Sequence, residues 1–329
     1  MRGDIAYNNI IDSDESRRAQ ASADAAPNLP ADRIDPSKFY ITQAYHKYTQ
    51  DNHEVWRDLF NRRWEMLERQ VSRTFIDGLK ILRLSPDRMP LLSDATLTHD
   101  CTITGGKLLT KGTKLEGVNR YLAEVSDWAS FGVPGYLPAK SFFACLAARQ
   151  FPTTVLIRPR EVMDYLPEPD IFHDVFGHVP LHASRVFADF LQTYGKAALA
   201  CDDPYHIERL GRLFWFTVEF GLIKEEGRVK LYGSGLVSSH SEAAYALEGA
   251  WERHADGPGS AVACSTRAVP EWRPFDLDRV CSTPFVIDHF QPIYYVLESF
   301  EQLRDAMNQY AEQVLGKNAL GGALVGVGG

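Results

Sequence analysis

Three histidines and three carboxylates lie within sixteen residues, in the segment PEPDIFHDVFGHVPLH (167–182). His173 and His178 are five positions apart, unlike the four-apart pair of helical zinc proteases. On an ideal α-helix this spacing leaves the two rings about 140° apart, so they could share a metal only if the helix ended between them. Gly177 and Pro180 predict such an end, because glycine adopts left-handed backbone angles and proline blocks continuation. Exposed or hydrogen-bonded loop histidines are the alternative.

A carboxylate in an apolar segment is the third candidate ligand. Residues 213–223 (LFWFTVEFGLI) are apolar on every side except for Thr217 and Glu219, which predicts a buried helix. A buried carboxylate must be neutralised, paired with a structural Arg or bound to a metal. Two imidazoles and one carboxylate form the triad that leaves open positions on ferrous iron. Zinc with the same ligands, used for hydrolysis, is the rival, and the ligand set does not separate the two metals.

Two further side chains have types suited to binding. Arg158 ends a predicted strand and could hold a carboxylate through two hydrogen bonds, although an ordinary ion pair is the commoner role. Ser238 lies in GSGLVSSH, where it could cap a helix that begins near Ser239 or Ser241, with Glu242 completing a capping box.

The elements that must position these residues are mostly helical. Apolar residues recur at helical spacing from Trp56 to Phe75, and residues 98–118 predict a hairpin with a turn near Lys111 and Gly112. The fold class is therefore mainly α with minor β. Further helices are predicted over 138–151, 171–178, 183–201, 204–225, 239–252 and 297–312, and short strands over 153–158, 228–232 and 284–287.

Composition excludes several functions. The chain has 329 residues and a net charge of −8, which argues against nucleic-acid binding. No run of about 18 apolar residues occurs, so no membrane span is expected. The five cysteines are widely spaced without a C-x-x-C pair, which predicts neither disulfides nor a thiolate zinc site. The acidic N-terminus does not resemble a signal peptide, and we expect a cytoplasmic protein.

Four blocks in order carry a family resemblance. PEPDIFHDVFGHVPL, FWFTVEFGL, YGSGLVSS and FQPIYYVLESF make residues 40–310 similar to the pterin-dependent aromatic amino acid hydroxylases, most of all to the bacterial phenylalanine-hydroxylating members. The resemblance implies a single helical catalytic domain with short strands. It also implies hydroxylation of L-phenylalanine to L-tyrosine with O2 and a tetrahydropterin at a non-haem Fe(II) ion.

The resemblance implies roles on the metal and substrate side. His173, His178 and Glu219 match the iron ligands. Arg158 matches the residue that holds the carboxylate of the amino acid, and Ser238 a substrate-side position. Residues that match the lining of the aromatic-ring pocket are Pro169 and Trp215.

On the cofactor side, GYLPAKSF (135–142) matches the pterin loop. Gly135, Tyr136 and Leu137 would contact the edge of the pterin, Phe142 would stack on its ring, and Asp174 matches an acid near it.

The chain also departs from its relatives. Phe214 stands where many have Tyr, and Leu166 replaces a Thr found in animal members. Residues 98–118 match nothing in the family and are expected to be an insertion, either a passive surface loop or a lid or partner surface. The regulatory domain and tetramer helix of animal members have no counterpart, which predicts a monomer.

Composition and the resemblance together set the expected domain limits. Residues 1–36 are expected to be a disordered tail, 37–315 the catalytic domain and 316–329 a loose glycine-rich tail. Trp215 and the apolar Ile287 favour an unsubstituted aromatic ring as the substrate. The alternatives are a tryptophan hydroxylase, a non-catalytic pterin-binding relative, and a zinc hydrolase with Asp174 or Glu168 as base.

Overall fold

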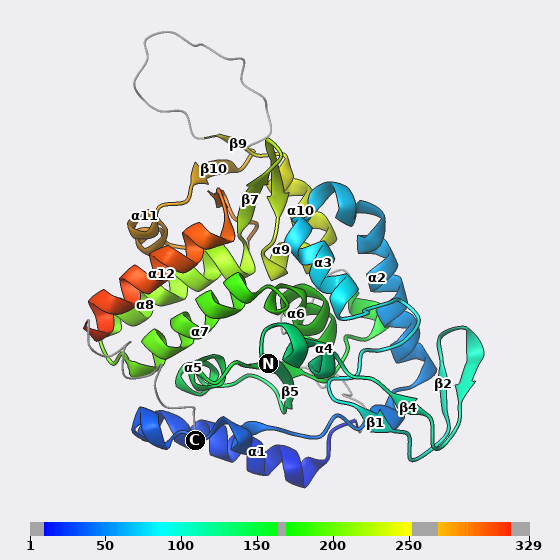
Figure 1. Ribbon diagram of the computed structural model, residues 1–329. Helices are drawn as coiled ribbons and strands as arrows, with labels where there is room; N and C mark the ends of the chain where they lie inside the picture. The colour runs from blue at the N-terminus through cyan, green and yellow to red at the C-terminus, as the bar shows by residue number, and fades with distance from the viewer. Residues whose placement is uncertain (1–9, 164–168, 252–268, 288, 317–329) are drawn as a thin grey trace, which may run out of the picture.

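Helices make up most of the molecule, as expected. The computed structural model describes residues 10–163, 169–251, 269–287 and 289–316 (Figure 1). α7 packs against both α5 and α12, while α2 and α3 lie on the other side of the molecule (Figure 1). The longer helices are α1 (Ser13–Ala25), α2 (Gln50–Gln70), α3 (Arg73–Ile81), α4 (Val118–Val125), α5 (Ala139–Ala147), α7 (Arg185–Ala200), α8 (Pro204–Phe214), α10 (His240–Leu247) and α12 (Phe300–Leu315). Shorter ones are α6 (Val179–His182), α9 (Ser234–Ser238) and α11 (Leu277–Ser282).

The helical pattern near the N-terminus is confirmed, but it belongs to two helices. α2 begins at the Thr49 cap, whose side chain forms a reciprocal capping box with Asn52. Trp56 and Phe60 point into the core from α2, and α3 starts after the cap Ser72. α2 also contributes Leu59, Arg62 and Arg63 to the lining of the larger cavity described below.

A five-stranded sheet covers one end of the molecule, in the order β8-β7-β11-β10-β9. β7 and β8 form an antiparallel hairpin whose two turn residues, Glu226 and Gly227, both have positive φ, as a tight hairpin turn requires. The remaining neighbours pair in parallel. The strands are β7 (Leu222–Glu225), β8 (Arg228–Leu231), β9 (Ala250–Trp251), β10 (Glu271–Pro274) and β11 (Ile293–Leu297).

Several predicted boundaries are wrong. The predicted helix over 138–151 ends at Ala147, because Arg149 takes a left-handed conformation (φ 58°) and β6 (Gln150–Thr154) follows at once. β6 pairs in parallel with β5 (Ala129–Val133), so the strand predicted over 153–158 begins earlier. The strand predicted over 284–287 lies instead at β11, where Tyr294, Tyr295 and Val296 are buried.

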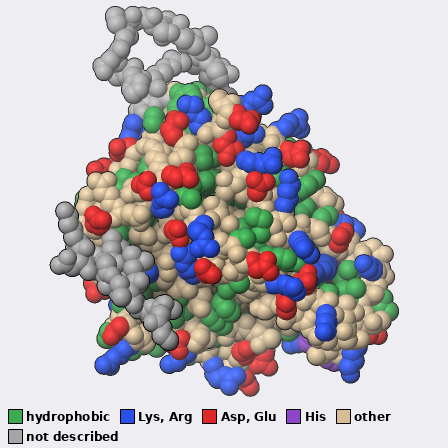
Figure 2. Space-filling model, viewed as in Figure 1, with side chains coloured by type: hydrophobic (Ala, Val, Ile, Leu, Met, Phe, Trp, Pro, Cys, Tyr) green, Lys and Arg blue, Asp and Glu red, His purple; other side chains and the backbone are tan. Residues whose placement is uncertain are grey.

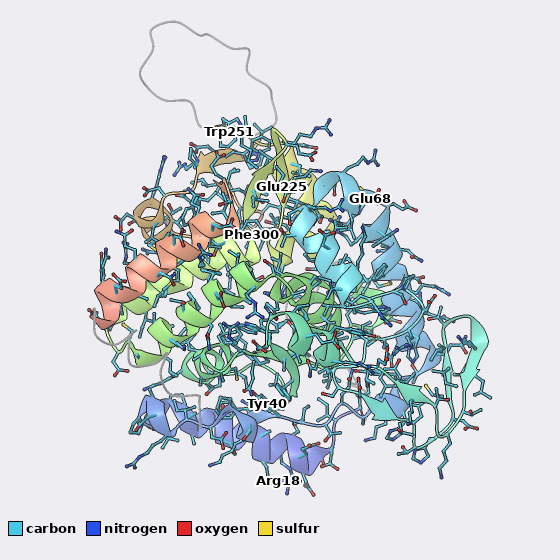
Figure 3. The ribbon with its side chains drawn as sticks, viewed as in Figure 1. Arg18, Tyr40, Glu68, Glu225, Trp251 and Phe300 are labelled. Atoms are coloured by element: carbon cyan, nitrogen blue, oxygen red, sulfur yellow. The ribbon has the colours of Figure 1, made fainter. Side chains whose placement is uncertain are left out.

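The expectation of a disordered tail over 1–36 is wrong for the described part, residues 10–36. Asp12 caps α1 by accepting the backbone N–H groups of Asp14 and Glu15. The helix crosses the molecule beside α5 and β5, with Arg18 on its outer side (Figures 1 and 3). Its buried residues are Ala19 and Ala23, so the apolar face carries no large side chain and the periodicity of the sequence is weak. Residues 1–9 and 317–329, including most of the predicted C-terminal tail, lie outside the described residues.

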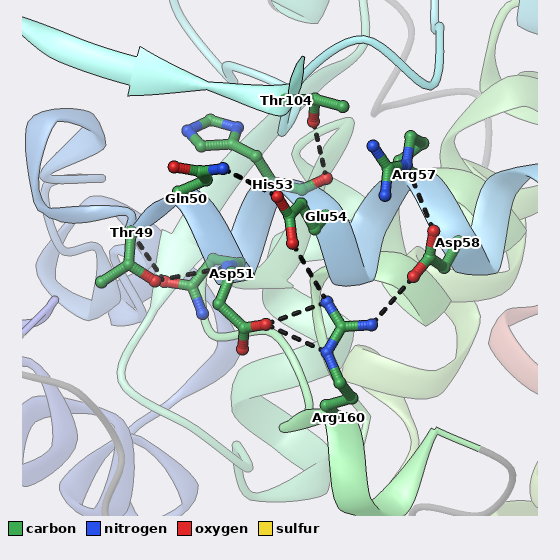
Figure 4. A network of polar contacts seen from close by, with 10 residues as sticks. Thr49, Gln50, Asp51, His53, Glu54, Arg57, Asp58, Thr104 and Arg160 are labelled. Carbon is green, nitrogen blue, oxygen red and sulfur yellow. Dashed lines mark hydrogen bonds and ion pairs between the residues drawn. The ribbon is translucent and has the colours of Figure 1, made fainter. Parts of the chain in front are cut away.

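Residues 98–118 do form a hairpin, but its turn is elsewhere. β2 (Cys101–Ile103) pairs with β3 (Lys107–Leu109) across Gly105 and Gly106, both at positive φ. The predicted turn near Lys111 and Gly112 leads instead from β3 to β4 (Lys114–Leu115), which pairs with β1 (Ala95–Thr96). The hairpin rests on α2, where the Thr104 hydroxyl donates to the backbone carbonyl of His53 at 3.0 Å (Figure 4).

The surface mixes charges of both signs. Figure 2 shows acidic and basic side chains interspersed over the face in view, without a continuous basic stripe there. In the described part of the chain, no helix combines the length and apolar character that crossing a bilayer requires.

Candidate metal and cofactor site

Two turns of π-helix carry the three candidate ligands. Residues Phe172–His178 form one, in which the Val179 N–H donates to the Asp174 carbonyl five residues earlier. Residues Trp215–Glu219 form the other, with the Phe220 N–H donating to the Trp215 carbonyl at 2.9 Å. Such wide turns recur at functional sites of proteins.

The wide turn corrects the prediction that the helix ends between the histidines. Gly177 is not among the described residues with positive φ, and the chain stays helical through Pro180 to His182. Five residues complete about one turn of a π-helix, because its hydrogen bonds join residues i and i+5. His173 and His178 therefore lie on the same side of the helix without a break.

Three ligand atoms converge at this point. The Nε2 atoms of His173 and His178 are 3.2 Å apart, and His178 Nε2 lies 3.2 Å from Oε1 of Glu219. His173 Nε2 lies 3.7 Å from Oε2 of Glu219. The three residues form a group that could hold one metal ion. Donors of this type and spacing fit an ion with bonds of about 2.0–2.2 Å to each ligand.

The environment also sets protonation states that suit a metal. Burial lowers the pKa of His173 to about 4, so its imidazole is neutral at physiological pH. Burial alone would raise the pKa of Glu219, but the neighbouring His178 and His173 and a hydrogen bond from Ser234 bring it down to about 2. A neutral imidazole and an ionised carboxylate are the forms that bind metal ions. The alternative of a structural Arg partner for Glu219 is not what the described residues show.

α9 holds two of the ligands through two hydroxyl groups one turn apart. Ser234 donates to Glu219 Oε2 at 2.8 Å. Ser238 donates to the Ser234 carbonyl at 2.7 Å, so its oxygen accepts from His173 Nδ1, 3.1 Å away. With its proton on Nδ1, His173 presents an Nε2 lone pair to the metal position.

Ser234 is a functional residue that sequence reasoning missed, because its approach to the histidine helix at Gly177 arises only in the folded chain. A Cβ atom on Gly177 would lie 3.1 Å from the Ser234 carbonyl oxygen and 3.3 Å from its Cβ. A larger residue at position 177 would therefore push α9 away from the histidine helix by a few tenths of an ångström. Ser239, not Ser238, is the cap of α10 and accepts the N–H of Glu242.

Arg158 is a buried residue with a partner that sequence reasoning also missed. Its Nε and Nη2 atoms donate to the two carboxylate oxygens of Asp170 at 2.8 and 2.9 Å. Burial tends to raise the pKa of Asp170, but the Arg158 guanidinium holds it below its ordinary value. Asp170 also accepts the His173 backbone N–H at 2.9 Å, so one carboxylate orients both the arginine and the histidine turn.

A surface network fixes the segment that follows Arg158. Arg160 hydrogen-bonds to Asp51 and Asp58 of α2, and its Nη2 lies 3.5 Å from Glu54 (Figure 4). Three acidic side chains on one face of α2 thereby fix Arg160, which lies two residues after Arg158 in the sequence.

Two cavities meet at His173 and Glu219, and His178 lines the smaller one. The larger, of about 600 Å³, contains the residues expected on the substrate side: Arg158, Pro169, Trp215 and Ser238. Trp215 is held by stacking on Phe285, with ring centroids 4.4 Å apart, and by donating to Gln291 at 3.1 Å. His173 and Glu219 line this cavity and the second one.

The second cavity, of about 380 Å³, contains the residues expected on the pterin side. It is lined by Gly135, Tyr136, Leu137, Phe142 and Asp174. It also contains Phe214, whose ring meets that of Phe142 edge-on at 5.6 Å. Leu166, the other departure named above, lies outside the described residues.

Asp174 faces this second cavity as a buried acid. Its Oδ2 accepts the Thr154 backbone N–H at 2.6 Å, and burial raises its pKa to about 7. All the predicted site residues are thus brought to one pair of connected cavities.

Comparison with known proteins agrees with this architecture. Residues 41–319 match the family described as biopterin-dependent aromatic amino acid hydroxylase. The chain belongs to this family.

Curated relatives include two bacterial phenylalanine-4-hydroxylases. The protein from Ralstonia nicotianae is 36% identical over 268 residues, which cover 82% of this chain and 72% of that protein. The protein from Chromobacterium violaceum is 35% identical over 272 residues, covering 83% and 78%.

A solved structure supports the same relationship. The crystal structure of Chromobacterium violaceum phenylalanine hydroxylase with bound iron(III) and 7,8-dihydrobiopterin matches with a TM-score of 0.67 and 32% identity. The match covers 91% of this chain and 92% of that one. The helical fold expected from the family resemblance is confirmed.

Proposed function

We propose that this member of the family is a phenylalanine 4-monooxygenase that converts L-phenylalanine to L-tyrosine. The observation that carries the proposal is the meeting of two cavities at the group formed by His173, His178 and Glu219, of which His173 and Glu219 line both cavities. The curated relatives named above are phenylalanine-4-hydroxylases, which supports the same substrate.

The three ligand residues would hold Fe(II), and the cavity beside the 135–142 loop would take a tetrahydropterin. When bound, iron and pterin together activate O2 for insertion of one oxygen atom into the aromatic ring. Two imidazoles and one carboxylate leave positions open on the metal, as such chemistry requires.

The other residues bind and orient the substrate. Arg158, aligned by Asp170, would receive the carboxylate of the amino acid through the N–H groups that Asp170 and the Met163 carbonyl leave unused. Trp215 and Pro169 would form the wall against the aromatic ring. Phe142, with Gly135, Tyr136 and Leu137, would hold the pterin, and Asp174 would lie near its edge. Apolar walls keep water from the reacting atoms.

The test is reconstitution of metal-free protein with Fe(II) under anaerobic conditions, followed by tetrahydropterin, O2 and each aromatic amino acid in turn. We expect tyrosine from phenylalanine only when iron, pterin and O2 are all present, and no product after loading with zinc. Hydroxytryptophan as the main product would reassign the substrate. Tyrosine formation that persists in Glu219→Ala or His178→Ala would contradict the metal site.

We also propose that the protein works as a monomer in the cytoplasm. Sedimentation should then give a mass near 37.0 kDa, and a mass of two or four chains would contradict the proposal.

A further inference from the structure

The larger cavity contains a carboxylate whose role the metal and pterin do not explain. On the proposed function, its ligand is a free amino acid, which carries an ammonium group as well as a carboxylate. Arg158 provides for the carboxylate. An ammonium group that enters a cavity loses its hydration, and the free-energy cost is high unless the cavity provides a partner for the charge. A carboxylate in the cavity wall is the strongest partner for it.

The candidates for that partner reduce to one residue. Among the described residues that line the cavity, the acids are Glu219 and Glu242. Glu219 faces the two histidines and Ser234. Asp170 nearby has both carboxylate oxygens bonded to Arg158. Glu242 is left as the acid in this wall with no part in the metal site or in the Arg158 pair.

Glu242 is held firmly, but by neutral groups. It lies in the first turn of α10, where its N–H donates to Ser239. Its Oε1 atom accepts the Gln291 backbone N–H at 3.2 Å and the Tyr294 hydroxyl at 3.1 Å. These two donors fix the position of the carboxylate without neutralising its charge. Burial raises the pKa of Glu242, as expected for an acid that a cation does not compensate.

Glu242 is also coupled to the wall that contacts the ring. Gln291, whose backbone bonds Glu242, accepts the indole N–H of Trp215 through its side chain. The segment around Gln291 therefore positions the aromatic wall and this carboxylate together.

We propose that Glu242 binds the ammonium group of the amino-acid substrate, opposite in charge to Arg158 in the same cavity. The inference rests on the function proposed above. It makes Glu242 the residue that distinguishes α-amino acids from aromatic acids without an amino group.

The test compares two ligands that differ only in that group, L-phenylalanine and 3-phenylpropanoate. Binding of each to the metal-loaded protein is measured by calorimetry for the wild type and for Glu242→Gln. Glutamine keeps the side-chain size and an oxygen for the Gln291 and Tyr294 donors, but it removes the charge. We expect the wild type to prefer phenylalanine by about 10- to 100-fold, as for a charge-assisted hydrogen bond, and the variant to lose this preference.

The matched control is Glu208→Gln, which removes the same charge from an exposed ion pair with Arg212 on α8. It should keep the wild-type preference. Glu242→Asp retains a carboxylate, but one methylene group farther from the ligand. It should therefore weaken the binding of phenylalanine more than the binding of 3-phenylpropanoate, while part of the preference for phenylalanine remains. This second variant provides the test if Glu242→Gln does not fold.

An unchanged preference in Glu242→Gln, or equal weakening of both ligands in Glu242→Asp, would overturn the assignment. Tyrosine formation by the wild type is measured in parallel. If the wild type forms no tyrosine but shows the preference and loses it in Glu242→Gln, the proposed reaction fails and the ammonium site stands. If it forms tyrosine but the variant keeps the preference, the ammonium site alone fails.

Discussion

At the scale of single residues, the metal site depends on side chains that do not themselves face the metal. Ser238 fixes the proton of His173 on Nδ1, and Ser234 fixes one oxygen of Glu219. Asp170 aligns Arg158 and the backbone of His173. Each of these contacts determines which lone pair or N–H group remains for a ligand.

The two serines give the first prediction. Ser234→Ala and Ser238→Ala should each lower the affinity for Fe(II) or Co(II) by about 10- to 100-fold, the usual effect of removing a hydrogen bond to a metal ligand. Competition with a coloured chelator measures the affinity. The control is Ser299→Ala, which removes the cap of α12. Equal affinities in all three variants would contradict the role of α9.

A buried histidine away from the site gives a pH prediction. His53 Nδ1 accepts the Met89 N–H at 2.9 Å, and burial lowers its pKa to about 4. In the unfolded chain histidine has a pKa of about 6.5. As the pH falls from 7 to 5, the unfolded chain therefore takes up a proton that the folded protein does not, and the free energy of unfolding decreases.

For one such group the decrease is about 2 kcal/mol between pH 7 and pH 5. Denaturant unfolding of the wild type and of His53→Gln at both pH values measures it. The variant should be less stable at pH 7 but lose less stability on acidification. Equal losses in the two proteins would show that His53 is not neutral in the folded state.

Residue types and spacing indicated the candidate metal ligands and the family resemblance assigned them, but neither predicted their supporting contacts. Glu219 could be recognised as exceptional because its neighbours in the sequence, apart from Thr217, are apolar. Asp170 and Ser234 could not, because acids and serines are common and their roles arise only when α9 and the 153–158 segment come beside the histidine turn. The sequence does not encode those approaches locally.

At the scale of elements, close helix packing depends on glycine. Gly195 lies in α7, where a Cβ atom would be 2.5 Å from the Ala147 nitrogen and 2.6 Å from the Leu146 Cβ of α5. Gly211 lies in α8, where a Cβ atom would meet nothing within 4 Å. The same substitution should therefore have opposite effects at the two positions.

Gly195→Ala should destabilise the protein by at least about 1–3 kcal/mol, because α5 and α7 must separate. Gly211→Ala should leave stability unchanged or raise it by up to about 1 kcal/mol, because alanine loses less entropy in a helix. Thermal unfolding of both variants checks this. A loss of stability in Gly211→Ala as large as in Gly195→Ala would contradict the packing described.

Helices with large apolar residues on one face were predicted well, as α2 and α7 show. The ends of elements were not, because they depend on single backbone conformations such as the positive φ of Arg149. α1 was missed because its buried face consists of alanines, whose burial needs a partner surface that the sequence pattern does not show.

At the scale of the whole molecule, α1 packs against residues from the middle of the sequence. Ala23 and Ala26 form a small buried cluster with Leu137 of the 135–142 loop. The Ser141 hydroxyl donates to the Ala23 carbonyl at 2.7 Å. Tyr40, which lies beside α1 in Figure 3, stacks on Phe131 of β5 with ring centroids 4.4 Å apart. α1 therefore supports the loop that would hold the cofactor.

Deleting residues 1–25 should consequently weaken tetrahydropterin binding by at least about tenfold, equivalent to about 1.4 kcal/mol. Metal affinity should stay within about twofold, because the hydrogen bonds that orient His173 and Glu219 come from α9 and not from α1. Titration of the metal-loaded protein with pterin measures the first quantity, and chelator competition the second. Unchanged pterin affinity would show that the loop holds its shape without α1.

The wide turn between His173 and His178 also bears on how such sites are found. The turn corresponds to a regular α-helix in which one extra residue has been inserted between two histidines that would otherwise be four positions apart. The insertion keeps both imidazoles on one side and leaves the helix running on. A search of new sequences restricted to histidines four apart would pass over this arrangement. In an apolar helical segment, a pair five apart with a small residue between its members is an equally good reason to look for a third ligand elsewhere in the chain.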